Sequence, residues 1–209
     1  MSSSIIVASI GAVHTAILVN ESSIESLDRA IGDGDHYLNV RRGCDVLLAM
    51  CADLESKPPG AAFNAIGMKL LSTIGGASGP LISGFFIAMG KSLADADSLD
   101  RKRVAHAFAA GVESIKLRGK ADVGEKTMLD VLIPISHLLL GHSEDALPLK
   151  DLCDVINAEA RENMLATRDM IATKGRAHYL GERALGHIDP GCKSCEVIIA
   201  AVTATVLSY

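Results

Sequence analysis

The stretch LDRAIGDGDHYLNV, residues 27–40, joins two helical patterns through a short turn that carries three aspartates. Asp28 lies near the end of a short helix, and Asp33 and Asp35 alternate with glycines directly after it. Because glycine tolerates tight backbone bends, such a turn can direct several carboxylates toward one point. A second helix is expected from about Leu38 onward. The stretch therefore predicts a helix–turn–helix unit with an acidic cluster at its turn.

Apolar residues recur at helical spacing on both sides of this unit. Near the start of the chain, Ile6, Ile10, Val13 and Ile17 fall on one helix face. The run 197–206 is rich in β-branched residues, but a lone strand among helices has no partner, so we expect a helix there. The pattern predicts about eight helices joined by short turns. Besides the short helix before Asp28, they cover approximately residues 6–17, 38–54, 60–72, 81–93, 100–119, 126–140, 149–173 and 194–207.

The composition fits one domain and argues against nucleic acid as a partner. The chain has 209 residues, of which 49% are apolar, so it can bury a sizeable core without disulfides. Its net charge is −5, and it holds no Trp, three Tyr and four Phe. Binding to nucleic acid needs a concentrated cationic surface or a base-stacking platform, and this composition offers neither. We therefore expect a single all-α domain over residues 1–209.

Cysteine usage and hydropathy bear on the cellular compartment. Five cysteines form no even framework, and the pair Cys192 and Cys195 is interpreted as two reduced thiols near a helix start. The apolar run 75–89 is crowded by glycines, which favours a buried helix over a membrane span. The apolar N-terminal stretch lacks a basic region, so we expect no signal peptide. A cytoplasmic protein without a membrane segment is the prediction.

The three aspartates indicate a site for a hard cation. Carboxylates this close in the chain repel one another unless a cation neutralises them, and oxygen-only ligation suits Mg²⁺ or Ca²⁺. A calcium-binding EF-hand loop beginning at Asp33 fails, because its sixth position is Leu38 rather than Gly and its twelfth is Cys44 rather than Glu. A solvated Asp-Gly turn that holds no ion is the alternative interpretation.

Two further segments suggest an anion site. The turn IGGASGP, residues 74–80, lets a ligand approach the backbone, and free N–H groups at the next helix start suit phosphate. The segment 174–191 is longer than a structural connection needs, and its Arg176 offers paired donors to phosphate. Gly90-Lys91-Ser92 is no P-loop, because the first glycine position holds Phe85. Each segment alone also fits a packing turn or a solvated loop, but together with the acidic turn they indicate a metal–nucleotide site.

Four motifs in this order resemble the nucleotide-binding subunit of dihydroxyacetone kinase, the DhaL type. They are LDRAIGDGDHYLN (27–39), LLSTIGGASGPL (70–81), RGKADVGEKTMLDVLIP (118–134) and KGRAHYLGERALGHIDPG (174–191). The resemblance implies an eight-helix antiparallel up-and-down barrel with ADP or ATP at one mouth. It also implies a phosphotransferase subunit whose sugar substrate is bound covalently, through a histidine, on a separate DhaK-type subunit. A phosphocarrier of the sugar phosphotransferase system is a further partner if bound ADP is rephosphorylated in place.

The same resemblance implies roles for individual residues. Two Mg²⁺ ions would be held by Asp28, Asp33 and Asp35 and would bridge the nucleotide phosphates, and Arg176 would act with them in catalysis. A general base is not expected on this chain, because the sugar lies on another one. The residues implied to contact the nucleotide are His36, Leu38, Asn39, Ala77, Ser78, Gly119, Met128, Arg176 and Asp189.

Three positions depart from the pattern of that family. Tyr37 stands where Gly is common, which would change the loop backbone or the mouth of the pocket. Glu125 replaces Asp and keeps the charge, and residues 192–195 replace a small polar run. The donor, the ketose and a homodimeric state stay open. Two other functions also stay open, namely a regulatory nucleotide-binding protein without turnover and a helical scaffold that binds neither metal nor nucleotide.

Overall fold

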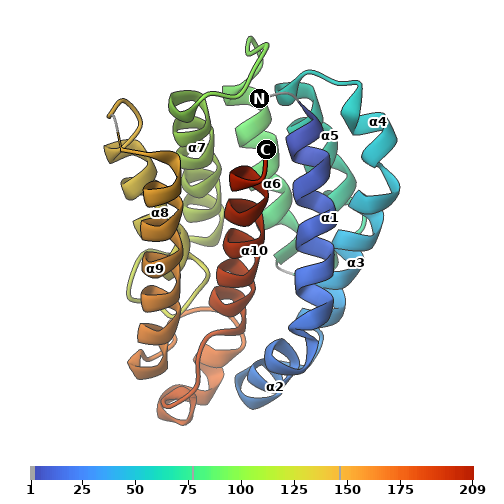
Figure 1. Ribbon diagram of the computed structural model, residues 1–209. Coiled ribbons are helices and arrows are strands. Elements are labelled where there is room, and N and C mark those ends of the chain that lie inside the picture. The colour runs from blue at the N-terminus through green and yellow to red at the C-terminus, as the bar shows by residue number, and fades with distance from the viewer. Residues whose placement is uncertain (1–2, 77, 146) are drawn as a thin grey trace.

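Helices are the only regular secondary structure in the computed structural model, which describes residues 3–76, 78–145 and 147–209 (Figure 1). The all-α prediction is confirmed. Eight of the α-helices in these ranges have 13 residues or more, whereas α2 has 11 and α4 has 5. The elements are α1 (Ser3–Val19), α2 (Glu21–Ile31), α3 (His36–Ala49), α4 (Cys51–Glu55), α5 (Pro59–Leu71), α6 (Ser78–Ser92), α7 (Arg101–Gly119), α8 (Leu129–Gly141), α9 (Leu149–Ala166), the 3₁₀ helices η1 (Thr167–Asp169) and η2 (Ala177–Ala184), and α10 (Pro190–Leu207).

The long helices contact one another in chain order, and the last of them returns to the first. Helix α1 contacts α3, α3 contacts α5, and each later helix contacts its successor up to α10, which lies against α1. The order of neighbours is thus closed, and the antiparallel up-and-down barrel stays a prediction. Both chain ends lie at one end of the molecule, whereas α2 and the segment before α10 lie at the other (Figure 1). The acidic turn follows α2 and so belongs to this second end.

Glycines allow helices α5 and α6 to approach each other closely. A Cβ atom added at Gly60 would lie 2.4 Å from the carbonyl oxygen of Leu93, and one added at Gly67 would lie 2.6 Å from Cγ1 of Ile87. Both distances are shorter than real Cβ contacts, so larger residues would force the two helices apart. This pair is therefore fixed by backbone-to-backbone packing.

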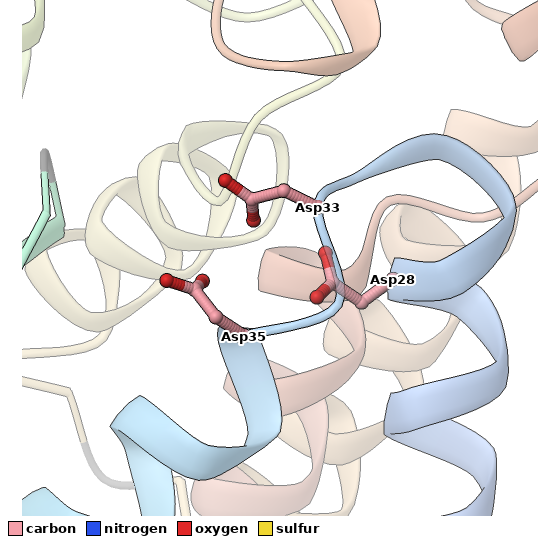
Figure 2. A group of neighbouring side chains, drawn as sticks. All are labelled: Asp28, Asp33 and Asp35. Atoms are coloured by element: carbon pink, nitrogen blue, oxygen red, sulfur yellow. The ribbon is translucent and has the colours of Figure 1, made fainter.

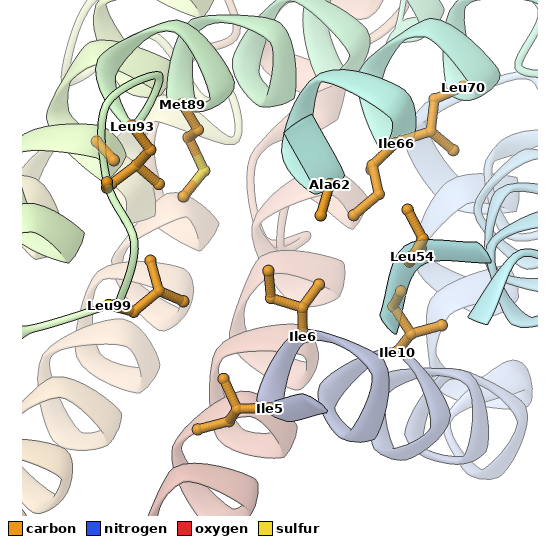
Figure 3. Close-up of a cluster of buried hydrophobic side chains, with 12 residues drawn as sticks. Ile5, Ile6, Ile10, Leu54, Ala62, Ile66, Leu70, Met89, Leu93 and Leu99 are labelled. Carbon is orange, nitrogen blue, oxygen red and sulfur yellow. The ribbon is translucent and has the colours of Figure 1, made fainter. Parts of the chain in front are cut away.

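A buried apolar cluster lies beside this helix pair. Figure 3 shows Ile6 and Ile10 of α1 pointing toward Leu54 and Ile66. Burying a side chain of this size stabilises the fold by about 1.5–3 kcal/mol. The cluster holds α1 against α4, α5 and α6, and it lies away from the acidic turn. Its buried members are Ile5, Ile6, Ile10, Leu54, Ala62, Ile66, Leu70, Met89, Leu93, Ala96, Leu99 and Ala107.

Two helices are shorter than the periodicity predicts. Helix α9 ends at Ala166 rather than near Thr173: it passes into the 3₁₀ turn η1, in which the N–H of Met170 donates to the carbonyl of Thr167, and the Lys126 ammonium donates to the carbonyls of Thr167 and Met170. The helix expected over 38–54 is interrupted at Met50, which separates α3 from α4. The run 197–206 is helical, as predicted, and belongs to α10.

Helix α10 is long and apolar enough to cross a membrane by length and composition. Helices α1 and α2 pass the same test only if the two, bent by 65°, count as one span. In this fold α10 packs against α1, α8 and α9, and core helices of this length pass the test as well. The absence of a membrane segment stays a prediction.

Candidate functional site

The structure brings the three aspartates of the opening stretch together (Figure 2). One carboxylate oxygen from each of Asp28, Asp33 and Asp35 lies within 4.8 Å of the other two. Asp28 is buried in the last turn of α2, whereas Asp33 and Asp35 are exposed in the turn that leads into α3. The cluster therefore has a fixed inner carboxylate and two outer ones that face solvent.

Glycine at position 32 is what allows Asp28 to take this place. A Cβ atom at Gly32 would lie 1.8 Å from Oδ1 of Asp28, so the carboxylate occupies the space that any other side chain would fill. The next glycine, Gly34, has a φ of +80°, in the left-handed region that favours glycine. The two glycines thus have separate tasks, the first in making room for a carboxylate and the second in turning the chain.

The N-terminus of α3 stabilises the inner carboxylate. The backbone N–H of His36 donates to Oδ2 of Asp28 at 3.0 Å, and a helix N-terminus favours a neighbouring negative charge. The ring of His36 is held from the opposite side, since its Nε2 lies 2.8 Å from Oγ of Ser194 in α10. Burial lowers the pKa of His36, while the carboxylates of Asp28 and Asp35 act in the opposite direction. Burial therefore favours the neutral form of the imidazole beside the three aspartates.

Arg176 reaches the cluster from a segment that is remote in the sequence. Its Nε lies 2.8 Å from Oδ2 of Asp33, and its side chain is 70% exposed. Asp35 precedes the first residue of α3, and its side chain makes no capping hydrogen bond. One outer carboxylate is thus paired with a guanidinium, and the other is not occupied by capping.

The segment that carries Arg176 begins and ends at neighbouring points. The N–H of Gly186 donates to the carbonyl of Arg168 at 2.9 Å, and the N–H of Asp189 donates to Oγ1 of Thr167 at 3.0 Å. Between these bonds the chain forms a compact loop that includes the 3₁₀ helix η2. The loop is closed at its base, and Arg176 extends from it toward the aspartates.

Asp189 and Met128 lie together at the start of α10. The Asp189 carboxylate accepts from the N–H of Cys192 at 2.8 Å and so caps α10, and burial raises the pKa of this carboxyl to about 6. A Cβ atom at Gly191 would lie 3.0 Å from Oδ2 of Asp189 and 3.6 Å from Cβ of Met128. This corner adjoins His36 through Ser194, one turn further along α10.

The other residues implied for nucleotide contact lie at helix ends. Leu38 and Asn39 are in the first turn of α3, Ser78 begins α6 and Gly119 ends α7. Across the described ranges, no side-chain hydrogen bond joins these four residues to the aspartates. Ala77 lies outside the residues that the structure describes.

Tyr37 does not lie at the mouth of the site. It is a residue of α3, and its side chain is 1% exposed within a cluster that includes Ile17, Ile24 and Val197. The expectation that it would alter the mouth is therefore wrong. Successive residues of a helix point in different directions, and the side chain at position 37 points away from that of His36 into the core formed by α1, α2, α3 and α10.

Sequence reasoning missed two residues that shape this end of the molecule. Ser194 contacts the ring of His36, but its place at the start of a predicted helix, in the run 192–195 that departs from the family pattern, did not indicate this partner. Lys126 is 1% exposed, although a lysine next to a glutamate in a turn is typical of a solvated position. A buried lysine needs hydrogen-bond partners and a solvated one does not. Those partners come from other parts of the fold, so the sequence alone does not tell a buried lysine from a solvated one.

Fold and site together define an all-helical domain whose acidic turn suits a hard cation beside an arginine. Residues 30–204 match the family model described as the DAK2 domain. The chain is 41% identical over 189 residues to the protein named PEP-dependent dihydroxyacetone kinase 1, ADP-binding subunit DhaL, from Listeria innocua, with 90% of this chain and 89% of that protein covered. It is 39% identical over 171 residues to the PEP-dependent dihydroxyacetone kinase ADP-binding subunit DhaL of Escherichia coli, with 82% and 81% covered.

A solved structure shares the fold. The dihydroxyacetone kinase from C. freundii, crystallised in complex with AMP-PNP and Mg²⁺, has a TM-score of 0.76 and 23% sequence identity. The match covers 98% of this chain and 34% of that one, so this chain spans about a third of the longer kinase. The chain belongs to the DAK2 domain family and, within it, to the DhaL type of dihydroxyacetone kinase subunit.

Proposed function

We propose that this chain binds a magnesium–nucleotide complex and passes a phosphoryl group to dihydroxyacetone, or a related ketose, held on a separate DhaK-type subunit. The observation that carries the proposal is the convergence of Asp28, Asp33 and Asp35 at the end of the molecule where Arg176 arrives. The relatives named as ADP-binding subunits support the nucleotide, and their description as subunits supports a partner. We also place the protein in the cytoplasm.

The donor set fits Mg²⁺. Carboxylate oxygens are the ligands that this hard cation prefers, and the space made by Gly32 holds the inner one in position. We propose two ions because the resemblance to the DhaL family implies two, and Asp28, Asp33 and Asp35 are the residues that would hold them. When bound, the ions would neutralise charge on the transferring phosphoryl group. The exposure of Asp33 and Asp35 leaves room for phosphate oxygens and water around them.

The chain's own residues would orient the nucleotide rather than activate the sugar. Arg176 pairs with Asp33 through Nε, and in the loaded site its guanidinium would donate to phosphate oxygens. The N-terminus of α6, at Ser78, would offer backbone N–H groups to the same phosphates. Met128 and Gly119 would border the adenine, and Asp189 would close the site at the start of α10. No residue here is needed to remove a proton from the ketose.

Bound ADP that is rephosphorylated in place is the donor route we favour. The supporting fact is that the relatives of similar length are named PEP-dependent and ADP-binding. On this route a phosphocarrier is a second partner of the chain. Direct donation by free ATP is the alternative route for the same site.

A reconstituted assay tests this function. The purified chain is first examined for co-purifying nucleotide, and is then combined with a DhaK-type subunit, dihydroxyacetone and Mg²⁺. One reaction receives ATP, and another receives a phosphocarrier system charged by PEP. We expect retained ADP and product formation only with the phosphocarrier. Product formation with ATP alone would show that free ATP, rather than a phosphocarrier, is the phosphoryl donor. Binding of MgADP without product from either donor would indicate a regulatory protein instead.

A further inference from the structure

Lys126 is a buried lysine that lies at the base of the loop carrying Arg176. Its side chain is 1% exposed, and its Nζ donates to the backbone carbonyls of Thr167 at 2.6 Å, Met170 at 3.2 Å and His187 at 2.7 Å. These three bonds use all the donors of an ammonium group. The lysine is therefore fully occupied in binding backbone.

The three carbonyls come from both ends of the loop. Thr167 and Met170 follow α9 where the loop begins, and His187 precedes α10 where the loop ends. The ammonium thus joins the start of the loop to its end. Two further hydrogen bonds join the same two stretches, from the N–H of Gly186 to the carbonyl of Arg168 and from the N–H of Asp189 to Oγ1 of Thr167. Since each of those is a bond to a neutral acceptor from a neutral donor, the charged donor is the strongest member of the set.

The turn before α8 is built to hold this lysine in place. Lys126 has a φ of +59°, a conformation that costs energy in a residue other than glycine. The carboxylate of Asp130 accepts hydrogen bonds from the N–H groups of Gly124 and Thr127, on both sides of the lysine. Glu125, the residue before the lysine, also binds the segment 167–189. Its Oε1 accepts from Oγ1 of Thr173 at 2.7 Å, and its carbonyl accepts from the N–H of the same residue.

Burial also makes this position unfavourable for a charge. It lowers the pKa of Lys126, and the carboxylate of Asp189 is the largest influence in the opposite direction. A lysine in such a place is retained only where its hydrogen bonds offset the loss of hydration. A hydrophobic residue would fill the space but would remove the charged donor from all three carbonyls, of which only that of Thr167 has a second donor within the described ranges, the N–H of Met170.

We propose that Lys126 is a positioning residue, which closes the base of the segment 167–189 and so presents Arg176 to the phosphates at the aspartate cluster. The inference rests on the proposed function in one respect, namely that Arg176 binds nucleotide phosphate in the loaded site. Lys126 touches neither nucleotide nor metal, and its effect on binding passes through Arg176.

The first test removes the ammonium and measures the loop. Lys126→Met is compared with the unaltered chain and with Lys150→Met, a control at an exposed lysine of α9 that pairs with Asp154 on the same helix. Trypsin cleavage after Lys174, Arg176 and Arg183 reports opening of the segment. We expect cleavage there to become about tenfold faster in Lys126→Met and to stay unchanged in the control, because local opening governs the rate. Equal cleavage rates in all three proteins would overturn the proposal.

The second test asks whether the effect passes through Arg176. Affinity for MgADP is measured by calorimetry in Lys126→Met, Arg176→Ala and the double variant. We expect Lys126→Met to weaken MgADP about ten- to hundredfold, as for other residues that orient a ligand-binding group. In the Arg176→Ala background the same substitution should weaken it less than about threefold, because the group that Lys126 positions is already absent. Multiplicative losses would overturn the proposal, since they would indicate a general structural role.

Two controls keep these outcomes separate. If Lys126→Met does not fold, Lys126→Gln is measured in the same way, because its amide keeps two donors. If neither variant folds, the proposal is overturned, because Lys126 would then stabilise the whole domain rather than position the loop. If the unaltered chain binds no MgADP, the proposed function fails together with the nucleotide part of this inference. The cleavage rates then still decide whether Lys126 closes the segment.

Discussion

Glycine has different tasks at the α5–α6 contact and at the acidic turn. At the contact, Gly60 and Gly67 are required because the neighbouring helix occupies the space of a Cβ atom. At the turn, Gly32 is required because a carboxylate of the same turn occupies that space. The first arrangement holds two helices together, whereas the second places a buried carboxylate beside the two exposed ones of the acidic turn.

This difference separates stability from binding. A side chain added at the helix contact must move a backbone, so its cost appears in the free energy of unfolding. A side chain added at the turn meets the Asp28 carboxylate at 1.8 Å and the Asp28 carbonyl oxygen at 2.8 Å. We expect the carboxylate to move, so that the affinity for the cation falls together with some stability. Substitutions in the two regions should therefore change two different measurements.

The largest effect is expected from Gly32→Ala. The new methyl group cannot coexist with Oδ1 of Asp28 in its present position, so the carboxylate leaves the cluster. We expect calorimetry to show MgADP binding weakened by about a hundredfold or more, the scale of a misplaced functional group. The control is Gly141→Ala, where a Cβ atom meets nothing within 4 Å. Normal binding by Gly32→Ala would contradict the placement of Asp28.

Gly67→Ala should produce the largest loss of stability without a comparable loss of affinity. Its Cβ atom would lie 2.6 Å from Cγ1 of Ile87 and 2.8 Å from the carbonyl of Ser83. We expect the free energy of unfolding in urea to fall by about 3 kcal/mol, the upper part of the range for overpacking. Gly11→Ala, in the open middle of α1, should instead raise it by about 0.5–1 kcal/mol. Equal effects at the two positions would remove the distinction between them.

The pH dependence of stability tests the corner near α10. The pKa of Asp189 is raised from 3.8 to about 6 by burial, so the folded chain binds this proton more tightly than the unfolded chain. Its contribution to stability is therefore full below about pH 4 and is lost as the pH rises through 6, by at most about 3 kcal/mol. Asp189→Asn keeps a capping side chain and should not show this decline. Parallel profiles for the two nucleotide-free proteins between pH 4 and 7 would argue against a buried carboxyl.

The smallest effect is expected from Tyr37→Phe. Within the described ranges, the Tyr37 hydroxyl is buried and makes no hydrogen bond of normal geometry, although burial and the nearby carboxylate of Glu21 raise its pKa and Arg41 acts in the opposite direction. Removing it should leave the free energy of unfolding unchanged or raise it by up to about 1 kcal/mol, because no hydrogen bond is lost. Affinity for MgADP should not change, although His36 is the preceding residue. A clear loss of MgADP affinity in Tyr37→Phe would indicate that the hydroxyl contributes to the site after all.

The features predicted from the sequence are those encoded locally. Helical spacing of apolar residues indicates a helix without reference to the rest of the chain, and α1, α7 and α10 follow that pattern. The three aspartates also lie within one short stretch, so their convergence depends on a single turn. Arg176 was expected at the same site as a donor to phosphate, but its ion pair with Asp33 was not predicted, because the arginine is remote in the sequence.

The features that sequence reasoning missed depend on contacts across the fold. Helix α9 ends at Ala166, and Lys126, far away in the chain, binds the carbonyls of Thr167 and Met170 just beyond that end. The apolar positions after Thr167 continue the helical pattern and give no sign of that partner. Tyr37 was misplaced for a similar reason, since only the packing of α1 and α10 on α3 decides which way position 37 faces.

The dependence of ADP binding on Mg²⁺ tests the central claim most directly. Titrations with ADP are run over a range of Mg²⁺ concentrations on the unaltered chain, on Asp35→Asn and on Asp45→Asn. Asp45 is the control, because it is an exposed carboxylate of α3 that pairs with His14. We predict that ADP affinity rises with Mg²⁺ in the unaltered chain and in Asp45→Asn, and that the rise is lost in Asp35→Asn. ADP affinity that is independent of Mg²⁺, or the same Mg²⁺ dependence in all three proteins, would contradict an aspartate-held magnesium site.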